Sequence, residues 1–166
     1  MARPTPIRPR AGQESAWDYP RPPRLERTHK PIRVDFAGEV LAQTVRAYRV
    51  LETSHPPVYY LPPGDVDFAL LEPSARNPSN CEWKGRAQYL DAVVRGRRAE
   101  EAAWRYLDPE EAFLPIAGYV AFYAGRVDAC YVDGIRAEPQ AGDFYGSWIT
   151  PDVVGPFKGG PGSWGW

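Results

Sequence analysis

The sequence has few of the residues that form disulfide frameworks or metal sites. Cys81 and Cys130 are its only two cysteines, and they lie far apart in the chain. This excludes both a disulfide framework and a C-x-x-C metal knuckle, and we expect neither a metal nor a cofactor. His29 and His55 are the only histidines, so any imidazole chemistry must use one of them.

Long apolar runs and a strong net charge are also missing. No stretch approaches the roughly 20 apolar residues of a membrane helix, and the N-terminus lacks the apolar core of a signal peptide. We therefore expect a cytoplasmic protein with no membrane partner. The net charge of −1 comes from 20 basic and 21 acidic residues, so bulk charge gives no reason to expect nucleic-acid binding.

Proline and glycine, with 19 and 15 residues, are concentrated at the two ends of the chain. Residues 1–31 are predicted to form an extended, basic, proline-rich arm. Residues 32–138 have the composition of a single β-rich domain, which suits a chain of 166 residues. Residues 139–166 form a tail rich in glycine, proline and tryptophan, which we expect to pack on the domain. The arm and the tail are also candidates for contacts within a homo-oligomer.

Short alternating segments separated by turn residues predict most of the middle of the chain to be β-strand. The predicted strands cover residues 32–36, 40–44, 47–52, 58–61, 81–94, 98–106, 119–123 and 127–132. The turn at 124–126 is expected to join the last two as a hairpin, and short helices are expected over 66–71 and 108–113. This pattern is typical of a mainly β protein, a compact antiparallel β-barrel or rolled sheet with one or two short helices.

The segment Cys81 to Tyr89 carries most of the candidate functional groups. On a strand, Lys84 shares one face with Glu82, and the opposite face carries Cys81 and Trp83. Lys84 could then act in a pocket, as an anion clamp or as a nucleophilic amine. The alternative is a surface ion pair with Glu82, worth less than about 1 kcal/mol.

A second group of candidates surrounds His55. Glu52 lies three residues before this imidazole, a spacing that suits an acid–base pair or a hydrogen-bonded turn. Cys81 would need a base such as His55 to act as a nucleophile, and otherwise it is an inert buried thiol. Tyr59 and Tyr60 point to opposite faces of their strand, so at most one of them lines a given pocket.

The pair Asp65 and Asp67 has the spacing of the D-x-D metal ligands of nucleotidyltransferases. The Gly-Ser turn expected before such a pair is missing. Prolines precede Asp65 and an apolar run follows it, which favours the start of a helix. The pair is therefore interpreted as a helix start rather than as a magnesium site.

Several separated motifs resemble, in order and spacing, the domain-of-unknown-function 427 family of small bacterial and fungal proteins. They are Val50-Leu51-Glu52, His55-Pro56-Pro57-Val58-Tyr59-Tyr60, Cys81-Glu82-Trp83-Lys84-Gly85-Arg86-Ala87, Ala103-Trp104 with Tyr106, and Val120-Ala121-Phe122-Tyr123. The resemblance covers roughly residues 32–133. It implies a compact β-rich domain and assigns no secure activity, although some members carry a nucleotidyltransferase label.

These observations favour a domain that binds a small polar or anionic ligand in an aromatic-lined pocket. The expected ligand-binding residues are Glu52, His55, Tyr59, Cys81, Trp83, Lys84, Arg86 and Tyr89. Two alternatives stay open: a metal-dependent nucleotidyltransferase-like enzyme, and a protein-interaction module that acts through the arm and the tail.

Overall fold

The computed structural model of the chain describes residues 3–81, 83–142 and 144–166, and it is mainly β. The strands are β1 (Glu14–Ser15), β2 (Arg24–Arg27), β3 (Ile32–Phe36), β4 (Glu39–Thr44), β5 (Tyr48–Leu51), β6 (Val58–Tyr60), β7 (Leu71–Pro73), β8 (Ser79–Cys81), β9 (Gly85–Val94), β10 (Arg97–Tyr106), β11 (Val120–Phe122), β12 (Ala129–Val132), β13 (Ile135–Arg136), β14 (Glu138–Pro139), β15 (Trp148–Ile149) and β16 (Val153–Val154). Within these described ranges, helical structure is confined to short 3₁₀ segments, η1 (Ala16–Asp18), η2 (Pro63–Asp65), η3 (Phe68–Leu70) and η4 (Glu111–Ile116). The predicted class, mainly β with short helices, is confirmed.

Three tight turns connect the strands of three hairpins. Ala37-Gly38 joins β3 to β4, Arg95-Gly96 joins β9 to β10, and Asp133-Gly134 joins β12 to β13. Both residues of each pair have positive φ, from 49° to 82°. Two-residue turns of this conformation match the right-handed twist of the flanking strands, and glycine adopts it without strain.

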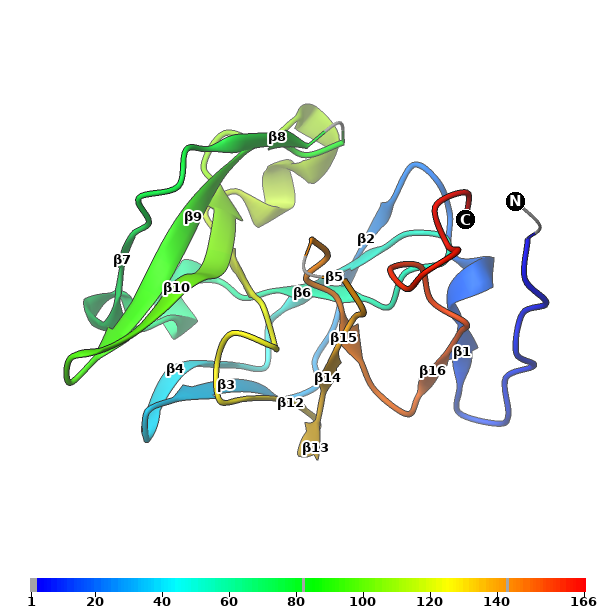
Figure 1. The fold of residues 1–166 in the computed structure, drawn as a ribbon, viewed down its shortest axis with the longest axis horizontal. Coiled ribbons are helices and arrows are strands. Elements are labelled where there is room, and N and C mark those ends of the chain that lie inside the picture. Colours follow the sequence, from blue (N-terminus) through cyan, green and yellow to red (C-terminus); the bar gives the residue numbers. More distant parts are fainter. Residues whose placement is uncertain (1–2, 82, 143) are drawn as a thin grey trace.

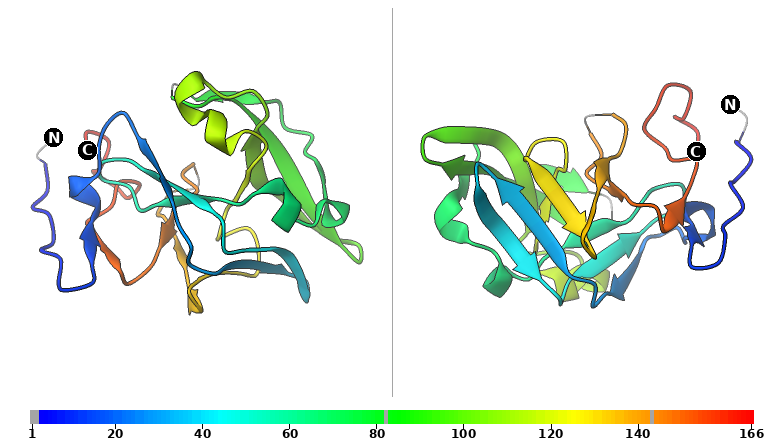
Figure 2. Two further views of the ribbon diagram at one scale, coloured as in Figure 1. Left: turned by 180° about the vertical axis from the view of Figure 1, so that it is seen from behind. Right: turned by 90° about the horizontal axis from the view of Figure 1, so that it is seen from below.

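The strands form several small sheets rather than one (Figure 1). The first and largest sheet has the order β11-β10-β9-β7, with β8 also paired to β9. The second sheet has the order β13-β12-β3-β4. Strands β2, β5 and β6 form a third, and β14 pairs with β15. In Figure 1 the first sheet lies to the upper left of β5 and β6, and the second lies below them; the left view of Figure 2 shows the same order from behind. Within the described residues none of these sheets closes into a barrel, so that part of the prediction is not confirmed.

Two local expectations were wrong. The segments around Tyr123 and Val127 do not form a hairpin, because β11 pairs with β10 whereas β12 pairs with β3. The amide of Tyr123 donates to Ala102 O at 2.8 Å and that of Asp128 to Asp35 O at 3.1 Å, so the connecting turn carries the chain from one sheet to the other. The helix expected over 66–71 is replaced by η2 and η3, which are separated at Val66 by a bridge to the second sheet.

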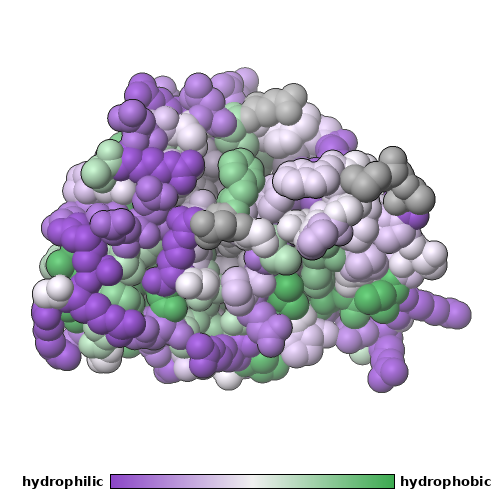
Figure 3. Space-filling model, viewed as in Figure 1, coloured by the Kyte–Doolittle hydropathy of each residue, from purple (hydrophilic) through white to green (hydrophobic). Residues whose placement is uncertain are grey.

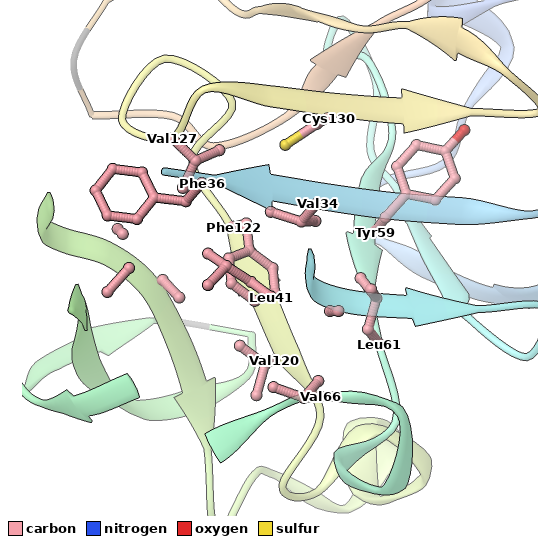
Figure 4. Packing of buried hydrophobic residues seen from close by; sticks show 14 of the residues in the cluster. Val34, Phe36, Leu41, Tyr59, Leu61, Val66, Val120, Phe122, Val127 and Cys130 are labelled. Carbon is pink, nitrogen blue, oxygen red and sulfur yellow. The ribbon is translucent and has the colours of Figure 1, made fainter. Parts of the chain in front are cut away.

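The main core lies between the first two sheets and includes residues from β6 and β11 (Figure 4). Its largest fully buried side chains include Trp148, Tyr59, Phe122, Ile32 and Leu41. The Nε1–H of Trp148 donates to Phe122 O at 2.8 Å, which satisfies the only polar atom of the largest core residue. The β9–β10 hairpin carries hydrophilic side chains on its outer side, seen on the left of Figure 3.

The first part of the arm and the last part of the tail lie against each other at one end of the molecule (Figures 1 and 2). Strands β1 and β16 pair in parallel, and the Nε1–H of Trp17 donates to Pro156 O at 2.9 Å. Strand β2 pairs with β5, so the arm also contributes to the third sheet. A homo-oligomer through these segments stays a prediction. In the part of the chain that the structure describes, no helix has the length and apolar character needed to span a membrane.

Candidate functional site

Because side chains alternate along a strand, one face of the first sheet packs in the main core and the other face points away from it. On β9 and β10, Tyr89, Trp104 and Tyr106 point to this side, and Leu90 and Ala103 point to the main core. The same alternation on β6 places Tyr60 with the first group. The result is a second, aromatic cluster between the first sheet and β5–β6, beside which lies a cavity of about 740 Å³.

The wall that carries Trp83 and Lys84 is a turn and not a strand, which corrects the prediction. Strand β8 ends at Cys81, β9 begins at Gly85, and these two residues are register partners. Gly85 has φ +101°, a conformation that L-residues rarely adopt, so a side chain here would be strained by the backbone even though an added Cβ would make only an ordinary van der Waals contact with Asp108 O at 3.4 Å. Glu82, the expected partner of Lys84, lies outside the described residues.

Six of the eight expected residues line this cavity, and two lie elsewhere. The six are Glu52, His55, Cys81, Trp83, Lys84 and Tyr89. Tyr59 is buried in the main core, where its ring lies 5.2 Å from that of Trp148. Arg86 is exposed on β9, and strand alternation places it opposite Tyr89. The sequence argument that only one of the adjacent tyrosines lines a pocket agrees with this geometry, because Tyr60 is the one that does.

Buried aromatic side chains form the floor of the cavity. The indole Nε1–H of Trp104 donates to the Tyr60 hydroxyl at 3.2 Å, with the two rings at 88°. Burial raises the pKa of Tyr60 and of Tyr106, so both phenols stay protonated at neutral pH. This floor is therefore aromatic and carries no charge at neutral pH.

A cluster of two arginines and a glutamate forms one side of the cavity. Arg76 donates to Glu101 Oε2 at 3.1 Å, and Arg126 donates to Glu101 O at 2.8 Å. The guanidinium of Arg76 lies 4.1 Å above the Tyr89 ring, and that of Arg126 lies 3.9 Å above the Tyr123 ring. Stacking and hydrogen bonds together hold both planar cations in place.

His55 is held at the other side by residues from the C-terminal tail. The Nε2 amide of Gln140 donates to Lys158 O at 2.6 Å and contacts His55 Nδ1 at 3.1 Å. Since the Lys158 carbonyl only accepts, it fixes the orientation of the amide, so Nδ1 is an acceptor and the imidazole proton is on Nε2. Gln140 Oε1 is buried without a partner among the described residues, which costs about 1–3 kcal/mol.

The burial of His55 favours the neutral imidazole. Burial lowers its pKa to about 4; Glu52 opposes this decrease, and Lys158 and Arg21 add to it. The Glu52 carboxylate is 3.8 Å from His55 Nε2, beyond hydrogen-bond distance, and 3.4 Å from Arg21 Nε. The pair predicted from the spacing of Glu52 and His55 is thus close in space, and its imidazole is a neutral donor.

Lys84 and Lys158 add two further cations to the cavity wall. Within residues 3–81, 83–142 and 144–166, neither ammonium has a carboxylate within 4.0 Å. Lys84 Nζ lies 5.8 Å from the centre of the Phe113 ring. Both lysines are half-buried, so their charges are less screened than those on an open surface.

The other candidate groups have structural partners or are inert. Asp65 accepts from Thr44 Oγ1 at 2.6 Å and from Arg46 at 3.2 Å, and Asp67 caps η3 by accepting from Ala69 N at 3.1 Å. Among the residues that the structure describes, no group of three or more metal-ligating side chains comes together. The interpretation as a helix start therefore holds for Asp67, which caps η3, but not for Asp65, which is the last residue of η2.

The two cysteines are free thiols in different surroundings. Cys130 is buried in the main core, where burial raises the pKa of its thiol, so it is an inert packing residue. Cys81 is half-buried at the wall of the cavity.

The sequence model of a family described as a domain of unknown function (DUF427) matches residues 24–133, more than half of the chain. The chain belongs to this family. The resemblance inferred from the separated motifs is therefore confirmed. No curated protein matches the chain. The matched range includes the turn at Lys84 and the acid–imidazole pair, whereas Gln140, Tyr145 and Lys158 lie beyond it.

Several cavity residues were missed from the sequence. They are Tyr60, Arg76, Glu101, Trp104, Tyr106, Tyr123, Arg126, Tyr145 and Lys158. The alternation of Trp104 and Tyr106 on β10 was a usable signal, because both residues share the face that carries Tyr89. The tail residues gave no such signal, because only long-range packing brings them to His55.

Proposed function

We propose that this protein binds a small organic oxyanion with a planar ring in the cavity between the first sheet and β5–β6. The observation that carries the proposal is the combination of aromatic walls with an excess of cations. Among the residues that the structure describes, four cationic side chains line the cavity, Arg76, Lys84, Arg126 and Lys158, against the two carboxylates Glu52 and Glu101.

The size and walls of the cavity suit such a ligand. Its volume of about 740 Å³ falls within the roughly 300–1,000 Å³ typical of small-molecule sites. The rings of Trp83, Tyr89, Trp104 and Tyr145 line it and can pack against a planar ligand in offset or edge-to-face arrangements. A ring-bearing molecule would therefore gain contact that a compact inorganic anion would not.

The charge pattern indicates the sign of the ligand. Glu101 is already engaged by Arg76 and Arg126, and Glu52 is engaged by Arg21. Lys84 and Lys158 have no such carboxylate partner in the described part of the chain. An incoming carboxylate or phosphate ester would neutralise these ammonium groups by charge-assisted hydrogen bonds.

Calorimetric titration with matched probes tests the proposal. Indole-3-acetate offers both a ring and an oxyanion, indole-3-acetamide keeps the ring without charge, and cyclohexylacetate keeps the charge without aromaticity. We expect indole-3-acetate to bind at least tenfold more tightly than either control. Equal affinity for all three probes, or no heat with any oxyanion, would contradict the proposal.

Substitution of Lys84 tests whether the ligand binds in the cavity or elsewhere on the surface. Lys84→Met should weaken indole-3-acetate binding about tenfold, since a hydrogen bond to a charged group contributes about 1.5–3 kcal/mol. Lys30→Met is the matched control, because Lys30 pairs with Asp152 at 2.6 Å and lines a different cavity. A loss of binding in the Lys30 variant but not in the Lys84 variant would refute the assignment.

Nucleotidyl transfer has less support, although the short name of the family model points to it. Asp65 and Asp67, the expected metal ligands, are engaged by Thr44, Arg46 and the backbone of η3. They also do not line the aromatic cavity. No observation therefore raises this alternative above the binding of an oxyanion.

A further inference from the structure

The C-terminal tail forms one end of the cavity, although the family match ends before it. Residues Phe144 to Ser147 and Lys158 line the cavity, and all of them follow residue 133. In Figure 1 the loop between β14 and β15 lies near the centre of the molecule, and its Tyr145 ring contacts His55 in the segment between β5 and β6. The amide of Trp148 donates to Pro57 O at 3.0 Å, which ties this loop to the segment that carries His55.

The tail also fixes the charge and the donor groups at this end. The amide of Lys158 donates to Ser54 O at 2.8 Å, so the backbone of the tail is attached next to His55. The ring of Tyr145 packs edge-on against the imidazole, with 4.9 Å between their centres. The Gln140 amide then holds Nδ1 as an acceptor, which leaves the Nε2–H as the donor of the ring.

From this arrangement we infer that the tail builds an oxyanion subsite, in which the Lys158 ammonium and the His55 Nε2–H hold the carboxylate or phosphate group of the ligand. Gln140 is the positioning residue that sets the imidazole tautomer. The inference rests on the proposed function and adds the place where the acidic group binds.

The local charge is consistent with this role. Two cations, Lys158 and Arg21, and one carboxylate, Glu52, act on the imidazole. Arg21 lies 3.4 Å from Glu52 and offsets its negative charge, so the end of the cavity keeps a net positive charge. Burial lowers the pKa of His55 to about 4, so the ring stays neutral at pH 7 and donates one hydrogen bond without adding a charge.

Binding assays on tail variants test the subsite. We expect Lys158→Met to weaken both indole-3-acetate and phenyl phosphate at least tenfold, and Lys158→Arg to restore most of the affinity. The affinity for cyclohexylacetate, which has a carboxylate but a saturated ring, should decrease by the same factor, because the subsite binds the oxyanion and not the ring. Lys30→Met serves again as the control, with affinity within twofold of the unchanged protein.

The outcomes distinguish the subsite from the cavity as a whole. If Lys84→Met weakens the probes and Lys158→Met leaves them within twofold, the subsite is refuted and the proposed function stands. If the unchanged protein binds no oxyanion, the proposed function fails and the subsite fails with it. Loss of binding in Lys158→Met without recovery in Lys158→Arg, at equal thermal stability, also contradicts the subsite.

The positioning role of Gln140 has its own spectroscopic test. The chain has only two imidazoles, His29 and His55, so their ¹⁵N signals are readily assigned. We expect His55 to show the Nε2-protonated pattern at pH 7 and to lose it in Gln140→Leu, together with a severalfold decrease in probe affinity. An unchanged tautomer in the folded Gln140→Leu variant would overturn this role.

Discussion

The buried His55 imidazole makes the stability of the protein depend on pH. Its pKa is about 4 in the folded protein and about 6.5 when unfolded, because burial disfavours the charged ring. Between these values the unfolded state binds more protons than the folded state. The stability that neutral His55 contributes is therefore fully present above pH 6.5 and is lost as the pH falls through 4.

The magnitude follows from the size of the shift. Each unit of difference in pKa corresponds to about 1.4 kcal/mol, so this one group should remove about 3 kcal/mol between pH 6.5 and pH 4. The side chain is only 10% exposed, so solvent screening reduces this figure little. A loss of this size is a large share of the roughly 5–15 kcal/mol that stabilises a typical domain.

Urea unfolding of the unchanged protein and of His55→Gln, at pH 7 and at pH 4.5, isolates the contribution of His55. Other groups also titrate, but they titrate in both proteins and cancel in the difference. We expect the unchanged protein to lose about 2–3 kcal/mol more than His55→Gln between these pH values. His29→Gln, which removes an exposed imidazole, is the control. Parallel losses in the unchanged protein and His55→Gln would refute the reasoning.

Three further substitutions test the fold around the cavity by urea unfolding. Trp104→Phe removes the donor to the buried Tyr60 hydroxyl and should lower the free energy of unfolding by about 1–3 kcal/mol. The same decrease in a protein that already carries Tyr60→Phe would contradict the hydrogen bond. Gly85→Ala should cost at least about 1 kcal/mol because of its φ of +101°, and an unchanged midpoint would be inconsistent with the described turn. Arg49 bridges Glu14 and Glu26 of the arm, so Arg49→Met should lower the free energy of unfolding by about 2–3 kcal/mol and make proteolysis of the arm faster. Equal proteolysis rates in the two proteins would argue against this bridge.

Local patterns in the sequence predicted the elements of the fold better than their arrangement. The turns at Ala37-Gly38, Arg95-Gly96 and Asp133-Gly134 were predictable, because few residues adopt paired positive φ values. The strand after Arg97 was predictable from its position, although Glu100 and Glu101 favour a helix by propensity. The pairing of the strands was not predictable, because the path of the chain from Tyr123 to another sheet depends on long-range hydrogen bonds.

The candidate site shows the same division. Lys84, Trp83 and Cys81 were found because several reactive side chains crowd one short segment. The strand geometry assumed for them was wrong, because the left-handed Gly85 converts this segment into a turn. The tail residue Lys158 was missed because no local pattern indicates that the segment around it would bond to Ser54.

Protection of lysines from chemical modification tests the central claim most directly. The chain has three lysines, Lys30, Lys84 and Lys158, and two of them line the cavity. Reductive methylation with and without phenyl phosphate, read by peptide mass spectrometry, measures how the ligand shields each one. We predict slower modification of Lys84 and Lys158 and an unchanged rate at Lys30. Unchanged rates at Lys84 and Lys158 under saturating phenyl phosphate would contradict an oxyanion site in this cavity.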